Sequence, residues 1–448
     1  MPNTELDKTF QKVSSISHCA KSNSTYVFTS VAHFLNVEFL KDCFLSLDRN
    51  KAVGVDKVNW YEYNRDIDKN LKSLVDRLKR KSFKPLAARR VYIPKENKGL
   101  RPLGISTIEN KIVERGIARI LEAIYEADFY EFSYGFRVGK NAHQALKTIG
   151  DTINHRQVNH IIEADIKSFF DDVDHDILIE FLKIRIKDSS LLYLIKRFLK
   201  AGYMDNNLIV KSDKGTPQGS ILSPILANIY LHYVLDKWFE EVVQSHIKGY
   251  CKLVRYADDF IIMCQYKYEA KRIERALTNR FKRYNLELHS DKTRAFSFGR
   301  FERVNAKNQN RKANTFDFLG FTHYCDTTRR GYFKVGRKTC GKKFRKKVKE
   351  LNTWLKNIRN QVSIKEWWKI LSLKLQGHYE YYGISENYKS IRKFYNIAIK
   401  LVKKWLSRRT QKRKKSWDRM KTYLEVFPLP RPSIRHSFYK TLSRNVVS

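Results

Sequence analysis

Acidic residues are scarce in this 448-residue chain, which has 46 Asp and Glu against 88 Lys and Arg. The formal net charge is therefore +42. A basic excess of this size says nothing about the fold, but it indicates a polyanionic partner, because a nucleic acid releases condensed counterions when cations neutralise its phosphates. We expect the chain to bind nucleic acid, and we expect that binding to weaken steeply with salt.

Cysteine is sparse and irregularly spaced. The six cysteines form no C-x-x-C pair and no Cys/His zinc pattern. This argues against a zinc finger and against a zinc-dependent nuclease. The spacing favours reduced, mostly structural thiols, as in a cytoplasmic protein.

Long apolar runs are absent as well. No stretch approaches the roughly 20 uncharged apolar residues of a membrane span. The first twenty residues contain Glu5 and Asp7 and lack an apolar core, so we expect neither a secretory signal nor a transit peptide. The sequence therefore predicts a cytoplasmic protein with no membrane partner, and no internal repeat is visible.

What is present is enough apolar sequence for two or three domains, with 42% hydrophobic residues. Apolar residues at helical spacing predict a helix over roughly 62–81. Residues 89–94 and 100–105 read as a hairpin, with Lys95 near its tip and Arg101 on its returning strand. Ser223 and Pro224 predict the start of a long amphipathic helix.

From about residue 323 the composition shifts. Strand patterns become rare, while Lys, Arg, Trp and Tyr dominate. A helix over 344–358 keeps one apolar stripe and carries a crowd of basic side chains, among them Lys342, Lys343, Arg345 and Lys346. A second basic run begins at Arg408 and Arg409. The sequence predicts a mixed α+β domain before this point and a largely helical basic domain after it.

The most informative short segment is Tyr256-Ala257-Asp258-Asp259, which lies between two apolar strand-like runs. Adjacent carboxylates repel each other, and an ordinary hairpin turn would use Asn-Gly or Asp-Gly. Paired acids at the tip of a stiff hairpin suit divalent cations, because Mg²⁺ is commonly held by one or two carboxylates plus substrate phosphates. In so basic a chain, this pattern indicates chemistry on a nucleic acid.

Nucleotidyl transfer by the two-metal route needs cations about 3.5–4 Å apart, and therefore a third acid on a neighbouring strand. Asp165, near the end of the apolar segment 160–166, is the best candidate, and the backbone carbonyl of Ile166 is a further oxygen ligand. Three nearby acids are rivals, but their polar setting favours a solvated helix face: Asp171, Asp172 and Asp174. The alternative for the whole set is a pair of Asp-rich surface turns, which the flanking apolar strands disfavour.

A series of short motifs, in order along the chain, identifies a resemblance. They are 54–56 (GVD), 92–95 (YIPK), 101–105 (RPLGI), 133–137 (SYGFR), 165–170 (DIKSFF), 215–220 (GTPQGS), 256–259 (YADD), 288–293 (LHSDKT) and 318–321 (FLGF). Each motif alone is weak, but their order and spacing over nearly the whole chain are specific. The chain resembles group II intron-encoded reverse transcriptases, of the compact type without a DNA endonuclease domain.

The resemblance implies a role for each matching residue. Asp165, Asp258 and Asp259 would hold two Mg²⁺ ions, with Mn²⁺ as a substitute, together with Ile166. The nucleotide would be bound by Lys95, Arg101, Phe170, Gln218 and Lys292. Lys95 and Arg101 match finger residues that clamp the triphosphate, and Phe170 matches the bulky residue that excludes a ribose 2′-OH; solvated cations and core packing are the alternatives.

The remaining roles concern the nucleic acid. Gln218 would touch the template or the nascent pair, and Gly219 would permit that close approach. Lys292 is a candidate general acid for the departing pyrophosphate, or simply an exposed lysine. Tyr256 and the C-terminal basic residues would contact RNA or DNA, in a region that resembles the thumb and maturase part of the family. A helical bundle with a solvated basic face is the alternative there.

The resemblance implies an α+β right-hand polymerase fold followed by an all-helical domain. We expect an N-terminal extension (1–50), fingers and palm (51–322) and a thumb/maturase domain (323–448). The implied activity is RNA-directed DNA polymerisation, with dNTPs, an intron RNA or other RNA template and a DNA primer or target as partners. Two alternatives remain open: a free-standing relative used in host repair or phage defence, and an RNA-binding splicing factor without polymerase activity. We expect a bacterial cytoplasmic, nucleoid-associated location, and a primer supplied without an endonuclease.

Overall fold

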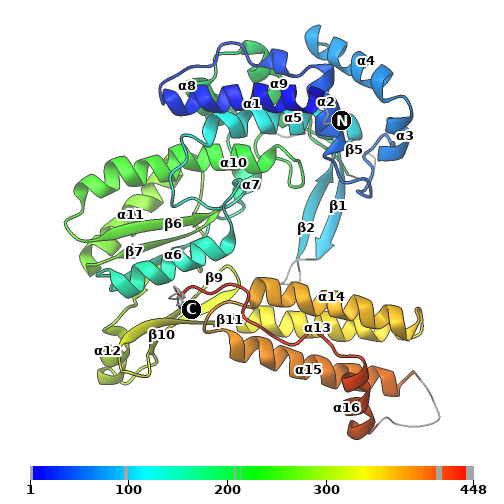
Figure 1. Cartoon of the computed structure of the whole chain (residues 1–448). Helices are drawn as coiled ribbons and strands as arrows, with labels where there is room; N and C mark the ends of the chain where they lie inside the picture. Colours follow the sequence, from blue (N-terminus) through cyan, green and yellow to red (C-terminus); the bar gives the residue numbers. More distant parts are fainter. Residues whose placement is uncertain (1–3, 95–98, 206–207, 212, 410–415, 440–448) are drawn as a thin grey trace, which may run out of the picture. The chain divides into compact units, whose positions relative to one another are not determined.

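The computed structural model describes residues 4–94, 99–205, 208–211, 213–409 and 416–439 (Figure 1). The chain divides into two compact units. The first comprises Met1–Asn141, Ile162–Ile262 and Tyr268–Ala295, and the second comprises Ala142–Ile161, Met263–Lys267 and Phe296–Ser448. Two short stretches therefore leave the first unit and return to it. The domain boundaries expected after residues 50 and 322 stay predictions.

The first unit begins with helices that pack on one long buried helix. Helices α1 (Thr4–Ser22) and α2 (Val37–Leu45) both lie against α5 (Ile108–Tyr125), most of whose residues are buried. The helix expected over 62–81 is two helices, α3 (Trp60–Arg65) and α4 (Ile67–Lys79), because Asp66 between them leaves the helical conformation at φ −120° and ψ 40°. Of the apolar residues that predicted this helix, Leu71 and Leu74 are buried in α4, whereas Ile67 and Leu78 are partly exposed.

The predicted basic hairpin is present. Strand β1 (Ala88–Pro94) pairs antiparallel with β2 (Leu100–Ile105), and β4 (Tyr203–Asp205) and β5 (Leu208–Val210) extend the sheet in the order β2-β1-β4-β5. Arg101 lies opposite Ile93. Lys95 lies outside the described residues.

A second four-stranded sheet has the order β6-β7-β3-β8. Its strands are β6 (Cys251–Tyr256), β7 (Asp259–Cys264), β3 (His160–Ala164) and β8 (Arg294–Ser297). All of β7 except Asp259 is buried. Helix α11 (Lys267–Arg283) contributes to its core, where the Phe281 and Phe260 rings stack with centroids 6.1 Å apart. The acids are thus attached to a sheet whose inner strand β7 is buried.

Helix α10 (Ser223–Leu231) is almost wholly buried and starts one residue earlier than predicted, with Pro224 in its first turn and Leu222 as the preceding cap. Beyond its end the chain winds as two π-helical stretches, η2 (His232–Asp236) and η3 (Phe239–Val243). A π-helical turn holds one more residue than an α-helical turn and is frequent at functional sites. The remaining helices of the unit are η1 (Ala32–Phe34), α7 (Phe169–Asp172), α8 (His175–Arg185), α9 (Ser189–Lys200) and η4 (Gln244–His246).

The second unit contains a three-stranded antiparallel sheet in the order β11-β10-β9. The strands are β9 (Thr315–Phe318), β10 (Phe321–Thr327) and β11 (Phe333–Thr339). Helix α6 (Ala142–His155) lies on β11, where the Val335 amide donates to the side-chain oxygen of Asn154 at 2.9 Å. Strands therefore continue past residue 323, and the helical region begins at Gly341 instead, because β10 and β11 complete a hairpin that composition alone did not predict.

Four helices follow: α13 (Gly341–Ile358), α14 (Ile364–Tyr382), α15 (Tyr388–Ser407) and α16 (Trp417–Val426). Helices α13 and α14 both pack on α15, as Figure 1 shows in yellow and orange. The short helix α12 (Glu302–Asn308) precedes the sheet. Among the helices that the structure describes, none has the length and apolarity needed to cross a bilayer. All six cysteines are free thiols, as expected, and all except Cys19 are buried.

Candidate active site

The paired acids lie on the tight turn between the edge strand β6 and the inner strand β7 of the second sheet. Asp258 occupies the turn and Asp259 is the first residue of β7. Ala257, which begins the turn, has a left-handed backbone with φ +57°. A left-handed conformation costs a non-glycine residue roughly 1–2 kcal/mol, so the surrounding structure must hold the turn in place.

Asp165 comes directly after β3, which is the neighbour of β7 in the sheet. Its backbone is fixed from the other side, because its carbonyl oxygen accepts a hydrogen bond from the His289 amide at 2.8 Å, and the Lys167 amide donates to Glu287 at 2.8 Å. Ile166 bridges to Leu288 between these two bonds. The segment expected to carry the third acid is therefore positioned beside the hairpin by the 286–293 segment.

The three carboxylates are close enough to alter one another's ionisation. The protein packed around Asp259 raises its pKa to about 7, although the residue keeps a surface open to solvent; the negative charges of Asp258 and Asp165 add to the increase. The pKa of Asp258 is also raised, first by burial and then by Asp165. Like charges gathered in one place disfavour the ionised forms. The site therefore has an excess of negative charge that a cation would relieve.

Divalent cations suit this donor set in its chemistry, because carboxylate oxygens are hard ligands and the repulsion among them falls when a cation binds. Within the part of the chain that the structure describes, no group of three His, Cys, Asp or Glu side chains is already arranged as a metal-binding cluster. The aspartates thus share an electrostatic environment without converging as a finished ligand set. The reverse transcriptases that the sequence resembles generally use divalent metal ions.

Lys292 reaches the acids from the 286–293 segment. Its ammonium nitrogen lies 2.5 Å from Oδ2 of Asp165, and its positive charge lowers the pKa of Asp259. The Lys292 side chain remains 56% exposed. Lys292 is thus an exposed cation beside Asp165, and its role as a general acid stays a prediction.

The loop after residue 214 carries Gln218 beside the same region. The Gln218 side-chain amide donates to Asp171 at 3.3 Å, and the Gln218 backbone carbonyl accepts from the Gly104 amide at 2.6 Å. Gly219 has φ +109°, and a Cβ there would lie 2.5 Å from the Gly104 oxygen. The close approach that requires glycine is therefore to strand β2; contact of Gln218 and Gly219 with nucleic acid stays a prediction.

Two further predicted nucleotide contacts have defined surroundings. Phe170 lies in the short helix α7, four residues after the end of the Asp165 segment, with its ring edge-on to the Phe169 ring at 5.4 Å. Phe169 is buried, whereas Phe170 is partly exposed. Arg101 is exposed on β2, yet its positive charge lowers the pKa of Asp258. Lys95 lies outside the described residues.

The predicted nucleic-acid contacts divide between the two units. Tyr256 is half-buried at the end of β6 in the first unit. In the second unit Lys342, Arg345 and Lys346 are exposed on α13, and Lys343 is half-buried. Beyond α15, the Arg408 guanidinium lies 5.2 Å from the Trp405 ring, and Arg409 follows it at the edge of the described chain. Trp405 is buried, so it is a core residue and not an exposed stacking platform.

One residue near the site was missed by sequence reasoning. Glu114 is fully buried in α5, where it accepts hydrogen bonds from the Ser106 hydroxyl and from the Ile221 amide, both at 2.9 Å. It thereby ties the end of β2 to the loop that carries Gln218. Burial raises the pKa of Glu114. The signal was available in the sequence, because Glu114 is an acid within the apolar face of a long helix.

Comparison with known proteins agrees with this geometry. A family model described as reverse transcriptase (RNA-dependent DNA polymerase) matches residues 93–323, which contain all three aspartates. The chain is 39% identical over 225 residues to the group II intron-encoded protein LtrA of Lactococcus lactis subsp. cremoris, covering 50% of this chain and 37% of that protein. It is 35% identical over 245 residues to protein YkfC of Escherichia coli (strain K12), covering 47% and 62%.

A third relative comes from a eukaryote. An uncharacterised 91 kDa protein in the cob intron of Schizosaccharomyces pombe is 43% identical over 169 residues, covering 38% of this chain and 21% of that protein. The chain spans less than two thirds of the length of each of these relatives. The family match, by contrast, covers more than half of the chain. It includes the β6–β7 hairpin, the aspartates and the Gln218 loop. The chain belongs to the reverse transcriptase (RNA-dependent DNA polymerase) family.

Proposed function

We propose that the protein is an RNA-directed DNA polymerase that extends a primer 3′-OH with dNTPs. The observation that carries this proposal is the placement of Asp165, Asp258 and Asp259 at the ends of the adjacent strands β3 and β7, with Lys292 paired with Asp165 and the charge of Arg101 lowering the pKa of Asp258. Carboxylates alone would repel both a nucleic acid and a triphosphate. Carboxylates with cations on two sides can accept metal ions and phosphates together.

The three aspartates, with the Ile166 carbonyl, would hold two Mg²⁺ ions, for which Mn²⁺ is a substitute. Bound there, the metal ions supply charge neutralisation at the attacking and leaving oxygens. Arg101, and Lys95 with it, would bind the triphosphate from the β1–β2 hairpin. Lys292 would move from Asp165 toward the pyrophosphate leaving group and donate its proton there. Phe170, which is partly exposed next to the buried Phe169 in α7, would exclude a ribose 2′-OH.

We further propose that the protein binds group II intron RNA and assists its splicing and mobility. Two relatives support this proposal through their printed names: a group II intron-encoded protein, and the mitochondrial nuclear intron maturase 3 of Arabidopsis thaliana, which is 30% identical over 142 residues. The exposed basic residues of α13 supply the charge that RNA binding requires. The protein would then act beside DNA, in the nucleoid of a bacterial cytoplasm.

Primer extension tests the polymerase proposal. The substrate is a poly(rA)/oligo(dT) duplex with dTTP and Mg²⁺, and the control is the Asp258→Ala, Asp259→Ala double variant. We expect extension by the wild-type protein that requires Mg²⁺ or Mn²⁺ and is lost in the variant. Tight RNA binding without extension at any salt concentration would contradict the polymerase proposal and favour an RNA-binding splicing factor.

A splicing assay tests the RNA proposal separately. The substrate is a transcript containing a group II intron that splices poorly at low Mg²⁺, and the readout is spliced exons. Because splicing does not use the aspartates of the polymerase site, the Asp258→Ala, Asp259→Ala variant should still promote it. Binding that is equal for intron RNA and for unrelated RNA of the same length would argue for a free-standing reverse transcriptase without an intron partner.

A further inference from the structure

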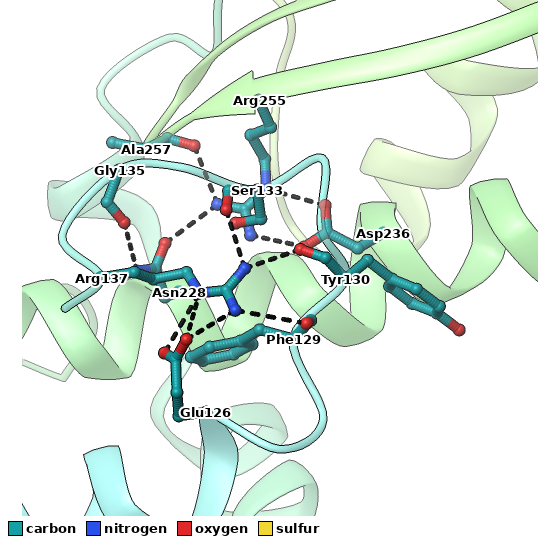
Figure 2. A network of polar contacts seen from close by, with 10 residues as sticks. All are labelled: Glu126, Phe129, Tyr130, Ser133, Gly135, Arg137, Asn228, Asp236, Arg255 and Ala257. Carbon is teal, nitrogen blue, oxygen red and sulfur yellow. Dashed lines mark hydrogen bonds and ion pairs between the residues drawn. The ribbon is translucent and has the colours of Figure 1, made fainter. Parts of the chain in front are cut away.

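Directly beneath the aspartate turn lies a buried arginine that the proposed chemistry does not use. Arg255 is the next-to-last residue of β6, and its side chain is completely inaccessible to solvent. Figure 2 shows its guanidinium surrounded by acceptors from three segments of the first unit. We propose that Arg255 is a positioning residue, which fixes the backbone of the Ala257–Asp258 turn and so sets where Asp258 and Asp259 lie; this inference rests on the function proposed above.

The first support is the set of bonds made by the Arg255 guanidinium. Its Nε donates to Oδ1 of Asp236 at 2.7 Å, and one terminal nitrogen donates to Oδ2 of Asp236 at 2.5 Å. The other terminal nitrogen donates to the Asn228 side chain at 3.0 Å and to the Ala257 carbonyl at 3.1 Å. Asp236 is as fully buried as Arg255. The bidentate pair with Asp236 thus orients the guanidinium. Its remaining terminal nitrogen then holds the carbonyl of Ala257, the residue with the left-handed backbone.

The second support is a loop that packs against the turn from outside the sheet. The Arg255 amide donates to Phe132 and its carbonyl accepts from Tyr134, both at 2.9 Å, so the loop at 132–135 adds to the edge of β6. Asn228 donates to the Gly135 carbonyl at 2.8 Å. A Cβ on Gly135 would lie 2.3 Å from the Ala257 nitrogen. Loop and turn are therefore in direct backbone contact, and only glycine fits between them.

The loop itself is anchored by a second buried arginine. Arg137 donates to the carbonyls of Tyr130 and Ser133 at 2.6 and 2.8 Å, and it pairs with Glu126 at 2.7 Å (Figure 2). The carbonyls that Arg137 binds precede Gly135 in the chain, so this arginine fixes the loop that presses on Ala257. Two arginines thus hold the turn, one through its carbonyl and one through the glycine that packs on it.

The Arg255→Lys variant distinguishes a positioning role of Arg255 from a general contribution to folding stability. Arg255→Lys retains a positive charge for Asp236, but one ammonium group cannot serve Asp236, Asn228 and the Ala257 carbonyl together. Gly135→Ala perturbs the turn from the opposite side without touching the ion pair. The matched controls are Arg337→Lys, which changes another buried arginine paired with Glu386 at 2.9 Å in the second unit, and Gly377→Ala, where a Cβ meets nothing within 4 Å.

The measurements are single-turnover nucleotide addition, its dependence on Mg²⁺ concentration, primer–template affinity and hydrogen exchange of the 253–262 segment, all at a temperature where each variant is folded. We expect Arg255→Lys and Gly135→Ala to lower the maximal rate at least tenfold and to raise the Mg²⁺ concentration for half-maximal rate. Primer–template affinity should change less than twofold. Amide exchange should accelerate at 256–259 and stay unchanged in β3.

Rates per folded molecule that equal wild type in both variants would overturn the proposal, as would losses of equal size in the two controls. If one variant does not fold, the other decides. If the wild-type protein extends no primer, the polymerase proposal fails, and hydrogen exchange alone decides the positioning role: acceleration confined to the turn supports it, and unchanged exchange refutes it.

Discussion

The ammonium nitrogen of Lys292 lies 2.5 Å from Oδ2 of Asp165, so the acid that precedes helix α7 already has a cation beside it. The two other aspartates have raised pKa values and share the same excess of negative charge. A divalent cation bound by Asp165, as proposed above, would therefore compete with Lys292 for one carboxylate. That competition, and three other features of the molecule, can be measured.

Removing the lysine should make the protein depend more on divalent cations. In Lys292→Ala, Asp165 and Asp259 lose the positive charge of this lysine, so the melting temperature in metal-free buffer should fall. Mg²⁺ that binds only the folded state should then restore more stability than it adds to the wild type. Differential scanning fluorimetry with and without Mg²⁺ measures both effects.

The control for this variant is Lys167→Ala, which removes an exposed lysine paired with Glu287 at 3.0 Å in the same unit. It should show the wild-type response to Mg²⁺. An equal Mg²⁺ response in all three proteins would mean that Lys292 does not compete with metal at Asp165.

Phe170→Ala should weaken the preference for dNTPs over rNTPs. Loss of the ring leaves space for a 2′-hydroxyl, so the ratio of kcat/KM for dTTP to that for UTP should fall by about 10–100-fold, the range of a steric filter. Steady-state incorporation on the poly(rA) template measures the ratio. Phe301→Ala, at a 58% exposed residue of the second unit, is the control; a lost rate with an unchanged ratio would indicate that Phe170 only packs the core.

The basic face of α13 should contribute to the salt dependence of RNA binding. Replacing Lys342, Lys343, Arg345 and Lys346 with Gln removes four charges, and each lost phosphate contact on single-stranded RNA reduces the slope of log K against log salt by about 0.7. We expect a slope shallower by about 2–3 in filter-binding titrations. The control variant replaces four basic residues of α11 with Gln and so removes the same charge: Lys271, Arg272, Arg275 and Lys282. Equal losses in both sets would mean that net charge matters and the α13 surface does not.

Stability should decline as the pH falls below about 6.5, in part because of His323. Burial and the charge of Arg337 lower the pKa of this histidine to about 3, and its ring stacks on Phe316 at 4.5 Å. The unfolded chain binds a proton near pH 6.5, whereas the folded chain does not until about pH 3. The contribution is therefore complete above pH 6.5 and is lost as the pH falls, by up to about 1.4 kcal/mol per pH unit.

Urea unfolding at pH 7, 6 and 5 measures the slope. His323→Gln is expected to be less stable than wild type at pH 7 and to lose less stability between pH 6.5 and 5, since glutamine does not titrate. His246→Gln, at an exposed histidine, should keep the wild-type slope. A variant slope equal to that of the wild type would show that His323 is protonated in the folded protein.

The sequence predicted the parts of the fold whose signal is local. Alternation and turn residues located the β1–β2 hairpin, and the apolar runs around Asp258 and Asp259 located β6 and β7. It was wrong about the uniform helix over 62–81, because Asp66 breaks the helix without proline or glycine to announce it. Strands β10 and β11 were missed because the chain was expected to become helical from about residue 323, and the basic residues of β11 resemble those of the helices that follow.

The candidate site shows the same division. Asp165, Asp258 and Asp259 were found because acids next to apolar strands are unusual. Arg255 was read only as part of the strand, and Asp236 was not considered, because their meaning depends on a contact between residues nineteen positions apart. Glu114 was overlooked although an acid on the apolar face of a long helix was visible in the sequence; its contacts with Ser106 and Ile221 were not. Long-range polar contacts within a core have no periodicity, so they emerge only when the fold is known.

The π-helical stretch His232–Asp236 gives this architecture an unusual vulnerability. The extra residue in that turn shifts every later side chain by about 100° relative to a regular α-helix. Deleting any single residue there would let the helix close its ordinary hydrogen bonds and would rotate the Asp236 carboxylate away from its arginine. A one-residue insertion or deletion in this helix, which is remote from the aspartate turn in sequence but bonded to it through Arg255, should therefore be tolerated as poorly as a substitution of the aspartates themselves.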